Sequence, residues 1–393
     1  GEGSYPVILI QTPYNKNLYR LGGLPLKIRQ NIEQSAYAVV VADWRCFYGS
    51  TQACVVQPDR GKDGYDLIDW ISKQAWCNGM VGTWGPSALG KIQYQTAREK
   101  HPAHRCAVPL VAGPQVSYQE YYPGGCLRTE YLEQLDALGY NLSGAVLANP
   151  TYNLSWQILE TQNQYYSQIQ IPMLLIGGWY DHNTDLQIED FQKLRSGSAL
   201  SVRNSHRLLM GPWVHGGFRG TGPGSSSAGE LNYPLAQGWA DSLALAFFDF
   251  HLRGIENHWE DSPPVHYYRM GLEKWESSDQ YPPEAIQEVP FYLQNTGRLS
   301  KELSISSSRT YTYNPSDPSP TVGGATLRND LLQGPYDQTP QVESRQDILT
   351  YTSESLQEVV SLNGKSRAII WISSDRMDTD LCLRLTDVYP DGR

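Results

Sequence analysis

The pattern of apolar and polar positions differs between segments of the chain. Over the first 114 residues, continuous apolar runs such as "PVILIQ", "AYAVVVADW" and "CAVPLVAG" alternate with amphipathic stretches such as "DGYDLIDWISKQA". Buried strands separated by amphipathic helices are typical of a parallel sheet that is covered on both faces. The pattern returns over residues 171–253, with "PMLLIGGWYD", "HRLLMGPWVHG" and the helical run "GWADSLALAFFDFHL". We therefore expect one mostly parallel α/β core built from residues 1–114 and 171–253.

Two further segments flank or interrupt this core. Residues 115–170 are rich in tyrosine and helical in character ("YLEQLDALGY", "SWQILETQNQYYSQIQ"). An insertion between two sheet strands lies over their C-terminal edge, where open α/β sheets bind ligands, so this segment is predicted to be a helical cap. Residues 254–393 contain short alternating runs such as "PVHYYRMG", "VPFYLQ" and "RAIIWISS", which predict a separate all-β jelly roll or sandwich.

Composition and charge narrow the classes of partner. The net charge of -10 provides no basic stripe for a phosphate backbone, so a nucleic-acid partner is not expected. No apolar run approaches the roughly 20 residues of a membrane span, and the first residues do not read as a signal peptide, so membrane insertion is not expected. The compartment stays open between cytoplasmic and secreted.

The cysteines have no metal-binding pattern. None of the six stands in C-x-x-C or Cys/His spacing, and we expect neither a metal nor another cofactor. The favoured interpretation is buried free thiols, and the alternative is a disulfide between Cys46 and Cys54 in an exported protein.

One serine stands in a motif that carries chemistry. The stretch "MVGTWGPSALGKIQYQ" places Ser87 in G-x-S-x-x-G spacing, after an apolar strand and before a helix. A nucleophilic serine on a sharp strand-to-helix turn needs small residues beside it because strand and helix approach closely. Gly85 and Gly90 supply those positions. The alternative is a small residue in an ordinary Gly/Pro loop.

A serine needs a base and an acid to become a nucleophile. Asp181 ends the apolar strand of "LLIGGWYDHN", and His215 ends the next strand in "LLMGPWVHGG". The order serine, acid, histidine, each at a strand end, matches the arrangement of a nucleophile elbow with its two partners. Taken alone, Asp181 also fits a helix N-cap and His215 a loop histidine. The three together predict a catalytic triad.

Long segments of the chain resemble a known family. The stretches "YPVILIQTPYNK", "GKDGYDLIDWISKQAWCNGMVGTWG", "IPMLLIGGWYD", "LLMGPWVHG" and "FYLQNTGRLS" are similar to the cocaine-esterase-like and X-prolyl dipeptidyl peptidase-like (CocE/NonD) α/β hydrolases. The resemblance implies an α/β-hydrolase core, an inserted helical cap and a C-terminal jelly roll. It also implies that Ser87, Asp181 and His215 are catalytic, and that the Tyr14 hydroxyl and the Ala88 N–H form the oxyanion hole. The alternative for Tyr14 is a turn aromatic after Pro13.

The chain departs from the family pattern in three respects. Ala88 replaces the tyrosine that usually follows the nucleophile, which keeps the backbone donor and removes an aromatic wall. The "DHNT" after the triad acid lacks the acidic residues of the amino acid ester hydrolases and so disfavours that subgroup. The family's opening strands precede residue 1 and its jelly roll extends beyond Arg393, so we expect a fragment of a longer protein with an incomplete jelly roll.

These features predict a serine hydrolase that cleaves an ester or amide through an acyl-enzyme, acting on a small molecule or a short peptide. Aromatic residues near the predicted site favour a hydrophobic acyl group, with core packing as the alternative for each: Trp84, Trp156, Trp179 and Tyr180.

Two other functions stay open. An X-Pro dipeptidyl peptidase would need a cap carboxylate for the free amine of its substrate, and Glu120, Glu130 and Glu133 are candidates. A non-catalytic ligand- or carbohydrate-binding protein with a vestigial triad is the alternative from another class. The oligomeric state is open, with an oligomer among the outcomes.

Overall fold

The chain divides into two compact units. The computed structural model describes residues 3–26, 35–114, 116–216, 222–283, 286–303, 308–328 and 330–392. Unit 1 comprises Gly1–Asp279 and Ala325–Gly334, and unit 2 comprises Gln280–Gly324 and Pro335–Arg393.

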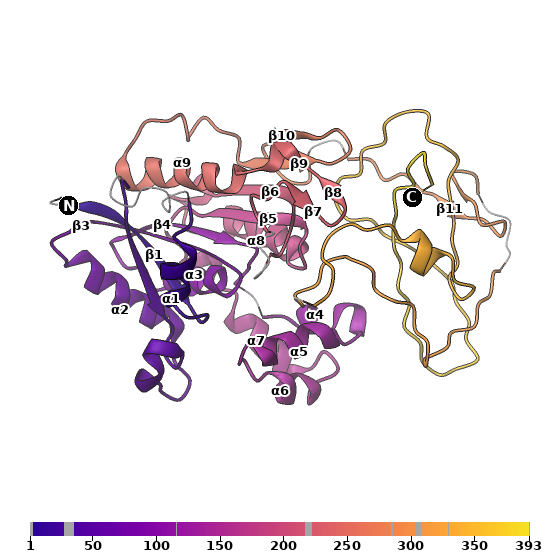
Figure 1. Cartoon of the computed structure of the whole chain (residues 1–393), viewed down its shortest axis with the longest axis horizontal. Helices are drawn as coiled ribbons and strands as arrows, with labels where there is room; N and C mark the ends of the chain where they lie inside the picture. Colours follow the sequence, from indigo (N-terminus) through magenta and orange to yellow (C-terminus); the bar gives the residue numbers. More distant parts are fainter. Residues whose placement is uncertain are drawn as a thin grey trace. The chain divides into compact units, whose positions relative to one another are not determined.

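An eight-stranded sheet forms the centre of unit 1, in the order β10-β9-β6-β5-β4-β3-β1-β2 (Figure 1). Neighbouring strands are parallel except for the pair β9 and β10 at one edge. The strands are β1 (Tyr5–Thr12), β2 (Ala38–Asp43), β3 (Cys77–Pro86), β4 (His104–Leu110), β5 (Leu174–Tyr180), β6 (Arg207–Val214), β9 (Val265–Arg269) and β10 (Lys274–Ser278). The predicted mostly parallel α/β core is confirmed.

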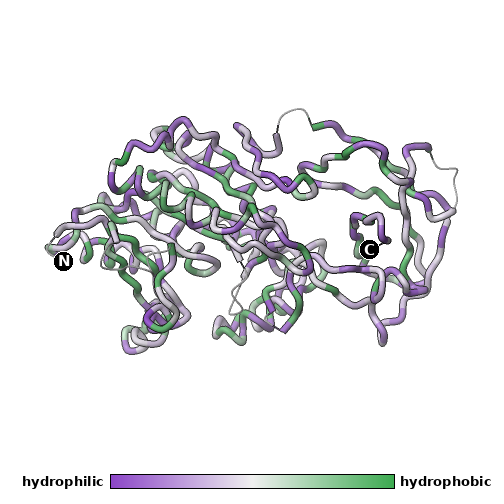
Figure 2. The backbone as a smooth tube through the Cα atoms, turned by 45° about the horizontal axis from the view of Figure 1, so that its top comes forward, coloured by the Kyte–Doolittle hydropathy of each residue, from purple (hydrophilic) through white to green (hydrophobic). Residues whose placement is uncertain are grey.

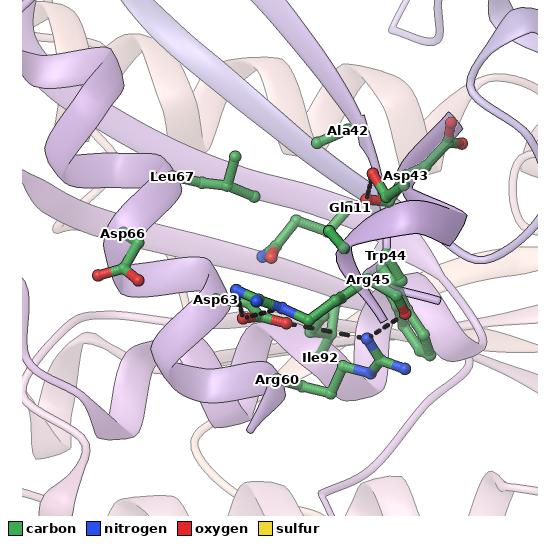
Figure 3. A pocket seen from close by; sticks show the side chains of 12 residues that line it. Gln11, Ala42, Asp43, Trp44, Arg45, Arg60, Asp63, Asp66, Leu67 and Ile92 are labelled. Atoms are coloured by element: carbon green, nitrogen blue, oxygen red, sulfur yellow. Dashed lines mark hydrogen bonds and ion pairs between the residues drawn. The ribbon is translucent and has the colours of Figure 1, made fainter. Parts of the chain in front are cut away.

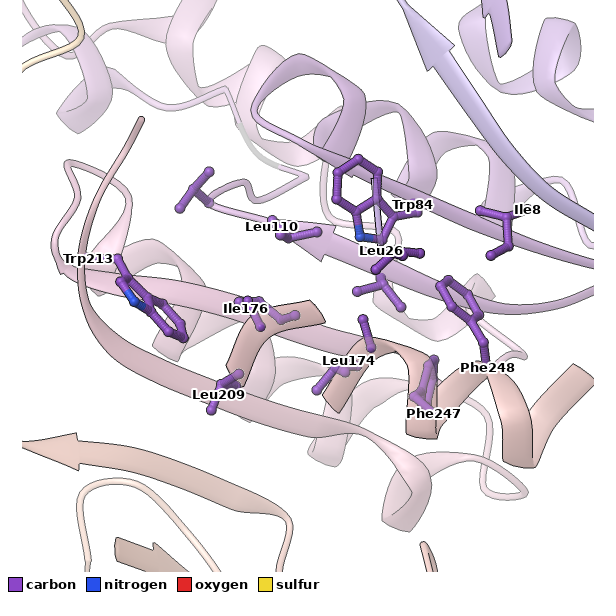
Figure 4. Close-up of a cluster of buried hydrophobic side chains, with 14 of the residues drawn as sticks. Ile8, Leu26, Trp84, Leu110, Leu174, Ile176, Leu209, Trp213, Phe247 and Phe248 are labelled. Atoms are coloured by element: carbon purple, nitrogen blue, oxygen red, sulfur yellow. The ribbon is translucent and has the colours of Figure 1, made fainter. Parts of the chain in front are cut away.

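Helices cover both faces of this sheet. Side chains alternate between the faces of a strand, so neighbouring residues of β1 enter different clusters. Val7 and Leu9 pack with Ile68 and Ile71 of α2 (Arg60–Ser72). Ile8 and Ile10 belong to the cluster that contains Phe247 and Phe248 of α9 (Trp239–Arg253), on the opposite face (Figure 4).

Figure 2 shows that hydrophobic residues are concentrated along the central strands of the sheet. The other helices of the core are α1 (Asn17–Gly22), α3 (Ala88–Arg98) and α8 (Thr184–Gly197). Shorter elements of the core are η3 (Tyr48–Ala53), η6 (Arg203–Ser205), η7 (Pro234–Ala236) and the hairpin of β7 (Ser227–Ala228) with β8 (Leu231–Asn232).

The insertion between β4 and β5 is helical and has a hydrophobic cluster of its own. Its elements are α4 (Tyr118–Tyr121), η4 (Pro123–Gly125), α5 (Thr129–Ala137), α6 (Ser143–Leu147), α7 (Leu154–Gln162) and η5 (Tyr166–Gln168). The cluster is largely aromatic and contains Tyr118, Tyr121, Tyr131 and Trp156. A cap with its own core can hold its shape as a unit over the strand ends.

The main sheet extends further along the chain than the sequence predicts. The predicted β domain begins at residue 254, yet β9 pairs parallel with β6 and forms a hairpin with β10. A short strand has the same alternating sequence in an edge hairpin and in a sandwich, because in both cases one face of the strand is buried and the other is exposed to solvent. Residues 325–334 also return to unit 1.

Unit 2 has little regular structure in its described part. It contains the antiparallel pair β11 (Tyr292–Leu293) and β12 (Leu299–Ser300), and the helical turn η8 (Thr339–Glu343). The predicted jelly-roll arrangement of two sheets therefore stays a prediction.

The favoured interpretation of six free thiols is wrong for one pair. Cys46 and Cys54 form a disulfide, because the turn of η3 brings their Cα atoms to 4.2 Å. Cys77 and Cys106 are buried free thiols, as expected. Among the described residues, no helix is both long and apolar enough to serve as a membrane span.

Candidate active site

Ser87 occupies a strained turn between β3 and α3. Its backbone has φ 57° and ψ −124°, a conformation that non-glycine residues adopt only when the surrounding structure enforces it. The Ser87 N–H donates to the carbonyl of Leu110, and the Ser87 carbonyl accepts from the N–H groups of Gly90 and Lys91 at 2.8 and 2.9 Å. The turn thereby holds a partly exposed serine at the C-terminal edge of the sheet.

The two glycines around Ser87 are required by close contacts. A Cβ on Gly85 would lie 2.5 Å from the Cβ of Leu89, and φ is 151° there. A Cβ on Gly90 would lie 2.6 Å from the Cβ of Ala112. Pro86 is tolerated because the residue before it is a glycine, which alone adopts that φ without strain. The predicted elbow geometry is therefore present.

A buried glutamine, which the sequence analysis missed, braces the same turn. The amide nitrogen of Gln93 donates to the carbonyls of Gly85, Leu89 and Val108 at 3.0–3.2 Å. A polar residue six positions after the serine, on a helix facing the sheet, was the signal that could have found it.

Asp181 and His215 meet at the ends of adjacent strands. Nδ1 of His215 lies 2.6 Å from Oδ2 of Asp181, and both side chains are buried. This bond fixes the imidazole proton on Nδ1 and leaves Nε2 as an acceptor. Nε2 of His215 is buried and has no hydrogen-bond partner among the described residues. This arrangement leaves Nε2 of His215 able to accept a proton.

The Asp181 carboxylate is stabilised in its charged form. Burial alone would raise its pKa, but the attraction and hydrogen bond of His215 outweigh burial, and the net pKa lies below the usual range. The N–H of Asn183 also donates to Oδ1 at 2.5 Å. Asp181 precedes α8 by three residues, and the N-cap position belongs to Asn183, whose side chain makes no capping hydrogen bond.

His182 is a neighbour of this pair that the sequence analysis did not single out. Its ring lies 4.5 Å from that of His215, at 38° between the planes. Burial lowers the pKa of His182 to about 3, so its ring is neutral at neutral pH. Its place directly after the strand-end acid was the available signal.

Tyr14 reaches Ser87 from the turn that follows β1. Burial raises the pKa of Tyr14, and its hydrogen bonds with the hydroxyls of Tyr140 and Ser87 partly offset that rise. The turn is tied to β2, because Asp43 accepts from the N–H of Lys16 at 2.7 Å and forms an ion pair with its ammonium at 3.2 Å. The Tyr14 hydroxyl thus lies within hydrogen-bonding reach of the Ser87 hydroxyl.

Ala88 is the first residue of α3, so its N–H has no carbonyl partner within the helix. A free N–H at a helix start carries partial positive charge, which suits an oxyanion.

A second serine–histidine pair in the chain has the opposite polarity. Oγ of Ser198 lies 2.9 Å from Nε2 of His206, and both residues are buried. Nδ1 of His206 accepts the N–H of Met173, so its proton is on Nε2 and points at the serine. An imidazole that donates to a serine cannot remove its proton, and this pair is structural.

The four predicted pocket aromatics have different surroundings. Trp84 belongs to the core cluster with Leu110 (Figure 4). Trp156 is buried in the cap, where its indole N–H donates to the carbonyl of Asn149. For these two residues, core packing, the alternative given above, describes their place. Trp179 and Tyr180 are partly buried next to Asp181; the indole of Trp179 donates to the Tyr268 carbonyl, and Tyr180 bonds the Tyr233 hydroxyl.

A cavity of about 240 Å³ lies elsewhere in unit 1 and includes none of the predicted site residues. Figure 3 shows Asp63 between Arg45 and Arg60, with N···O distances of 2.7 and 3.8 Å.

Three ligand-type residues come together at the candidate site. Single atoms of Asp181, His182 and His215 lie within 4.8 Å of one another. The two imidazole rings are tilted by 38° to each other, and the Asp181–His215 bond occupies one atom of each partner. A metal ligand needs a free lone pair, so a metal ion would compete with this hydrogen bond.

Comparisons with known proteins agree with this fold and with a serine hydrolase. A family model described as X-Pro dipeptidyl-peptidase (S15 family) matches residues 1–146 and 131–217. A second, for the X-Pro dipeptidyl-peptidase C-terminal non-catalytic domain, matches residues 257–393. Cocaine esterase from Rhodococcus sp. strain MB1 Bresler is 29% identical over 451 residues, which cover 100% of this chain and 77% of the relative.

Solved structures show the same fold. An aminopeptidase from a Thaumarchaeota archaeon superposes with a TM-score of 0.69 at 22% identity, and an α-amino acid ester hydrolase with 0.70 at 21%. Each alignment covers 91% of this chain and 69% of the other. The chain belongs to the X-Pro dipeptidyl-peptidase (S15) family and is a serine hydrolase of the esterase and peptidase type.

Proposed function

We propose that the protein hydrolyses esters of small, apolar acyl groups, with Ser87 as nucleophile, His215 as general base and Asp181 as the acid that orients it. The observation that carries the proposal is the pairing of a 2.6 Å Asp181–His215 bond with a buried, unpartnered Nε2 on the same ring. Together with a serine in a strained turn, this arrangement suits acyl transfer.

Acylation uses groups that the chain itself supplies. Nε2 of His215 removes the proton of Ser87 as Oγ bonds to the ester carbonyl carbon. The carbonyl oxygen becomes an oxyanion, stabilised by the Tyr14 hydroxyl and the Ala88 N–H. The C–O bond to the leaving group then breaks, and the imidazolium returns its proton to the departing alkoxide.

Deacylation repeats these steps with water. His215 takes a proton from water, the hydroxyl attacks the acyl carbon, and the bond to Oγ of Ser87 breaks as Oγ is reprotonated. The products are a carboxylic acid and the free enzyme, and no redox or external co-reactant is required.

The cap carboxylates favour an ester over a peptide with a free amine. Lys91, one helical turn beyond Ser87, lies 3.6 Å from Glu120. Glu130 lies 3.3 Å from Arg128, and Glu133 lies 3.0 Å from Arg328. Each carboxylate that was a candidate for an ammonium ion already has a cation beside it. A substrate ammonium would have to compete with these cations.

One observation keeps the dipeptidyl peptidase as a second candidate. Oε2 of Glu120 is buried and has no hydrogen-bond partner among the described residues, while Oε1 accepts from the Tyr131 hydroxyl at 2.5 Å. If the ammonium group of a substrate displaced Lys91, Glu120 would become the partner of that ammonium group.

Labelling with a fluorophosphonate probe tests the nucleophile. We expect the wild-type protein to react, Ser87→Ala to lose labelling, and Ser198→Ala, the matched control from the structural pair, to keep it. Absence of labelling in the wild type would reject the proposal and support the non-catalytic ligand-binding alternative.

Substrate class is tested by comparing kcat/KM for an aryl ester with that for an Ala-Pro anilide. We expect the ester to be the better substrate. Faster release from the anilide would reject the esterase and favour the dipeptidyl peptidase, and Glu120→Gln would then be expected to raise KM for the anilide.

A further inference from the structure

A tyrosine of the cap reaches the predicted oxyanion hole. Tyr140 lies between α5 and α6, and its hydroxyl is 3.5 Å from that of Tyr14. Both side chains are partly buried. Among the described residues of the cap, Tyr140 is the one whose side chain meets the Tyr14 hydroxyl, so it links the cap directly to the core at this point.

The segment that carries Tyr140 is held on both sides. Asp136, in the last turn of α5, accepts from the N–H of Leu142 at 2.5 Å and thus closes the turn around Tyr140. The Tyr140 ring also contacts Phe47, with 6.5 Å between ring centroids, in the loop closed by the Cys46–Cys54 disulfide. These contacts fix the ring against the core, so the approach of the two hydroxyls is a feature of the fold.

Either hydroxyl of this contact can be the donor. Burial raises the pKa of both phenols, most strongly that of Tyr140. Both phenols therefore keep their protons at neutral pH, and each hydroxyl has a proton to donate. When Tyr140 donates its proton to Tyr14, the proton of Tyr14 is left for the oxyanion.

We propose that Tyr140 is a positioning residue of the oxyanion hole, which orients the Tyr14 hydroxyl and strengthens it as a donor. The inference rests on the proposed function. Hydrogen bonds in a chain polarise one another, so a bond into Tyr14 makes its own O–H a stronger donor. The 3.5 Å contact shortens as charge develops on the substrate oxygen, because catalytic hydrogen bonds tighten toward the transition state.

The consequence is that the cap contributes to the chemical step as well as to substrate binding. A direct oxyanion donor is worth on the order of 100- to 1,000-fold in kcat. Tyr140 acts on the oxyanion through one intervening hydrogen bond, the one to Tyr14. Its hydroxyl is therefore expected to raise kcat about 10-fold and to leave KM unchanged.

The test is a double-mutant cycle on aryl ester hydrolysis with Tyr14→Phe, Tyr140→Phe and the double variant. We expect Tyr140→Phe to lower kcat about 10-fold with KM little changed, and the double variant to equal Tyr14→Phe. The control is Tyr118→Phe, which removes a cap hydroxyl bonded to the Pro150 carbonyl at 2.9 Å and should leave kcat unchanged.

Three results would overturn the inference. An unchanged kcat in Tyr140→Phe would show that its hydroxyl does no work in catalysis. A loss that persists in the Tyr14→Phe background would assign the effect to cap packing. A wild-type protein without Ser87-dependent turnover would remove the proposed function itself, a result that the labelling experiment separates from the other two.

Discussion

Replacing Asp181 by asparagine keeps the shape of the side chain and removes its charge. Oδ1 of Asp181 accepts from the N–H of Asn183, so the amide oxygen of the variant would keep that position and its NH₂ group would face His215. The NH₂ group would donate to Nδ1, and the imidazole proton would move to Nε2. Nε2 is the atom that has to accept the proton of Ser87, so the variant holds the base in the wrong tautomer.

The size of the effect follows from the burial of the pair. Side-chain exposure is 0% for Asp181 and 6% for His215, so water cannot take the place of the carboxylate. Restoring the productive tautomer would place two N–H groups against each other, at about 1–3 kcal/mol for each unsatisfied group. With the lost attraction for the imidazolium, the total is on the order of 4–6 kcal/mol, or roughly 1,000- to 10,000-fold in kcat.

The assay is aryl ester hydrolysis over a range of pH, with thermal unfolding measured in parallel. Asp185→Asn, an exposed position in the first turn of α8, is the control and should retain wild-type kcat. A folded Asp181→Asn protein with less than about a 10-fold loss of kcat at the pH optimum would refute the reasoning, because a buried charged partner of the base cannot be that dispensable.

Three further changes test the packing and electrostatics of unit 1. Gly90→Ala should lower the free energy of unfolding by about 1–3 kcal/mol because its Cβ would meet Ala112, whereas Gly144→Ala, where the space is open, should not; equal melting temperatures for the two variants would contradict this. Burial raises the pKa of Asp190 to about 7, above its unfolded value of about 4, so the native state binds the extra proton and wild-type stability falls as pH rises through that window. The difference in unfolding free energy between Asp190→Asn and wild type should therefore grow in favour of the variant as pH rises to about 7, and stay constant above that. Urea titrations at several pH values measure this difference, and a difference that does not change with pH would contradict the prediction. Replacing Cys46 and Cys54 together by serine should lower the free energy of unfolding by about 2–3 kcal/mol by releasing a short loop, and calorimetry that shows no change would exclude a stabilising role for the disulfide.

The elements that the sequence predicted well are those whose signal is local. The apolar run of β6 is buried at every position, so it reads as a central strand without knowledge of its neighbours. The turn at Ser87 is predicted by its glycines, and the strand ends at Asp181 and His215 by the polar residue that follows each apolar run. The pairing of β9 with β6 could not be predicted in this way, because a half-buried edge strand has the same alternation in any sheet.

The sequence by itself determined the fold class, the order of the candidate catalytic residues and the family, because periodicity and motif spacing are properties of neighbouring positions. Only the tertiary structure decided which side chains surround that site. The contacts of His182 with His215, of Lys91 with Glu120 and of Tyr140 with Tyr14 depend on where the cap and the strand ends meet. Each of these contacts joins residues that are far apart in the sequence. A pattern of neighbouring residues carries no information about the distance between two such side chains.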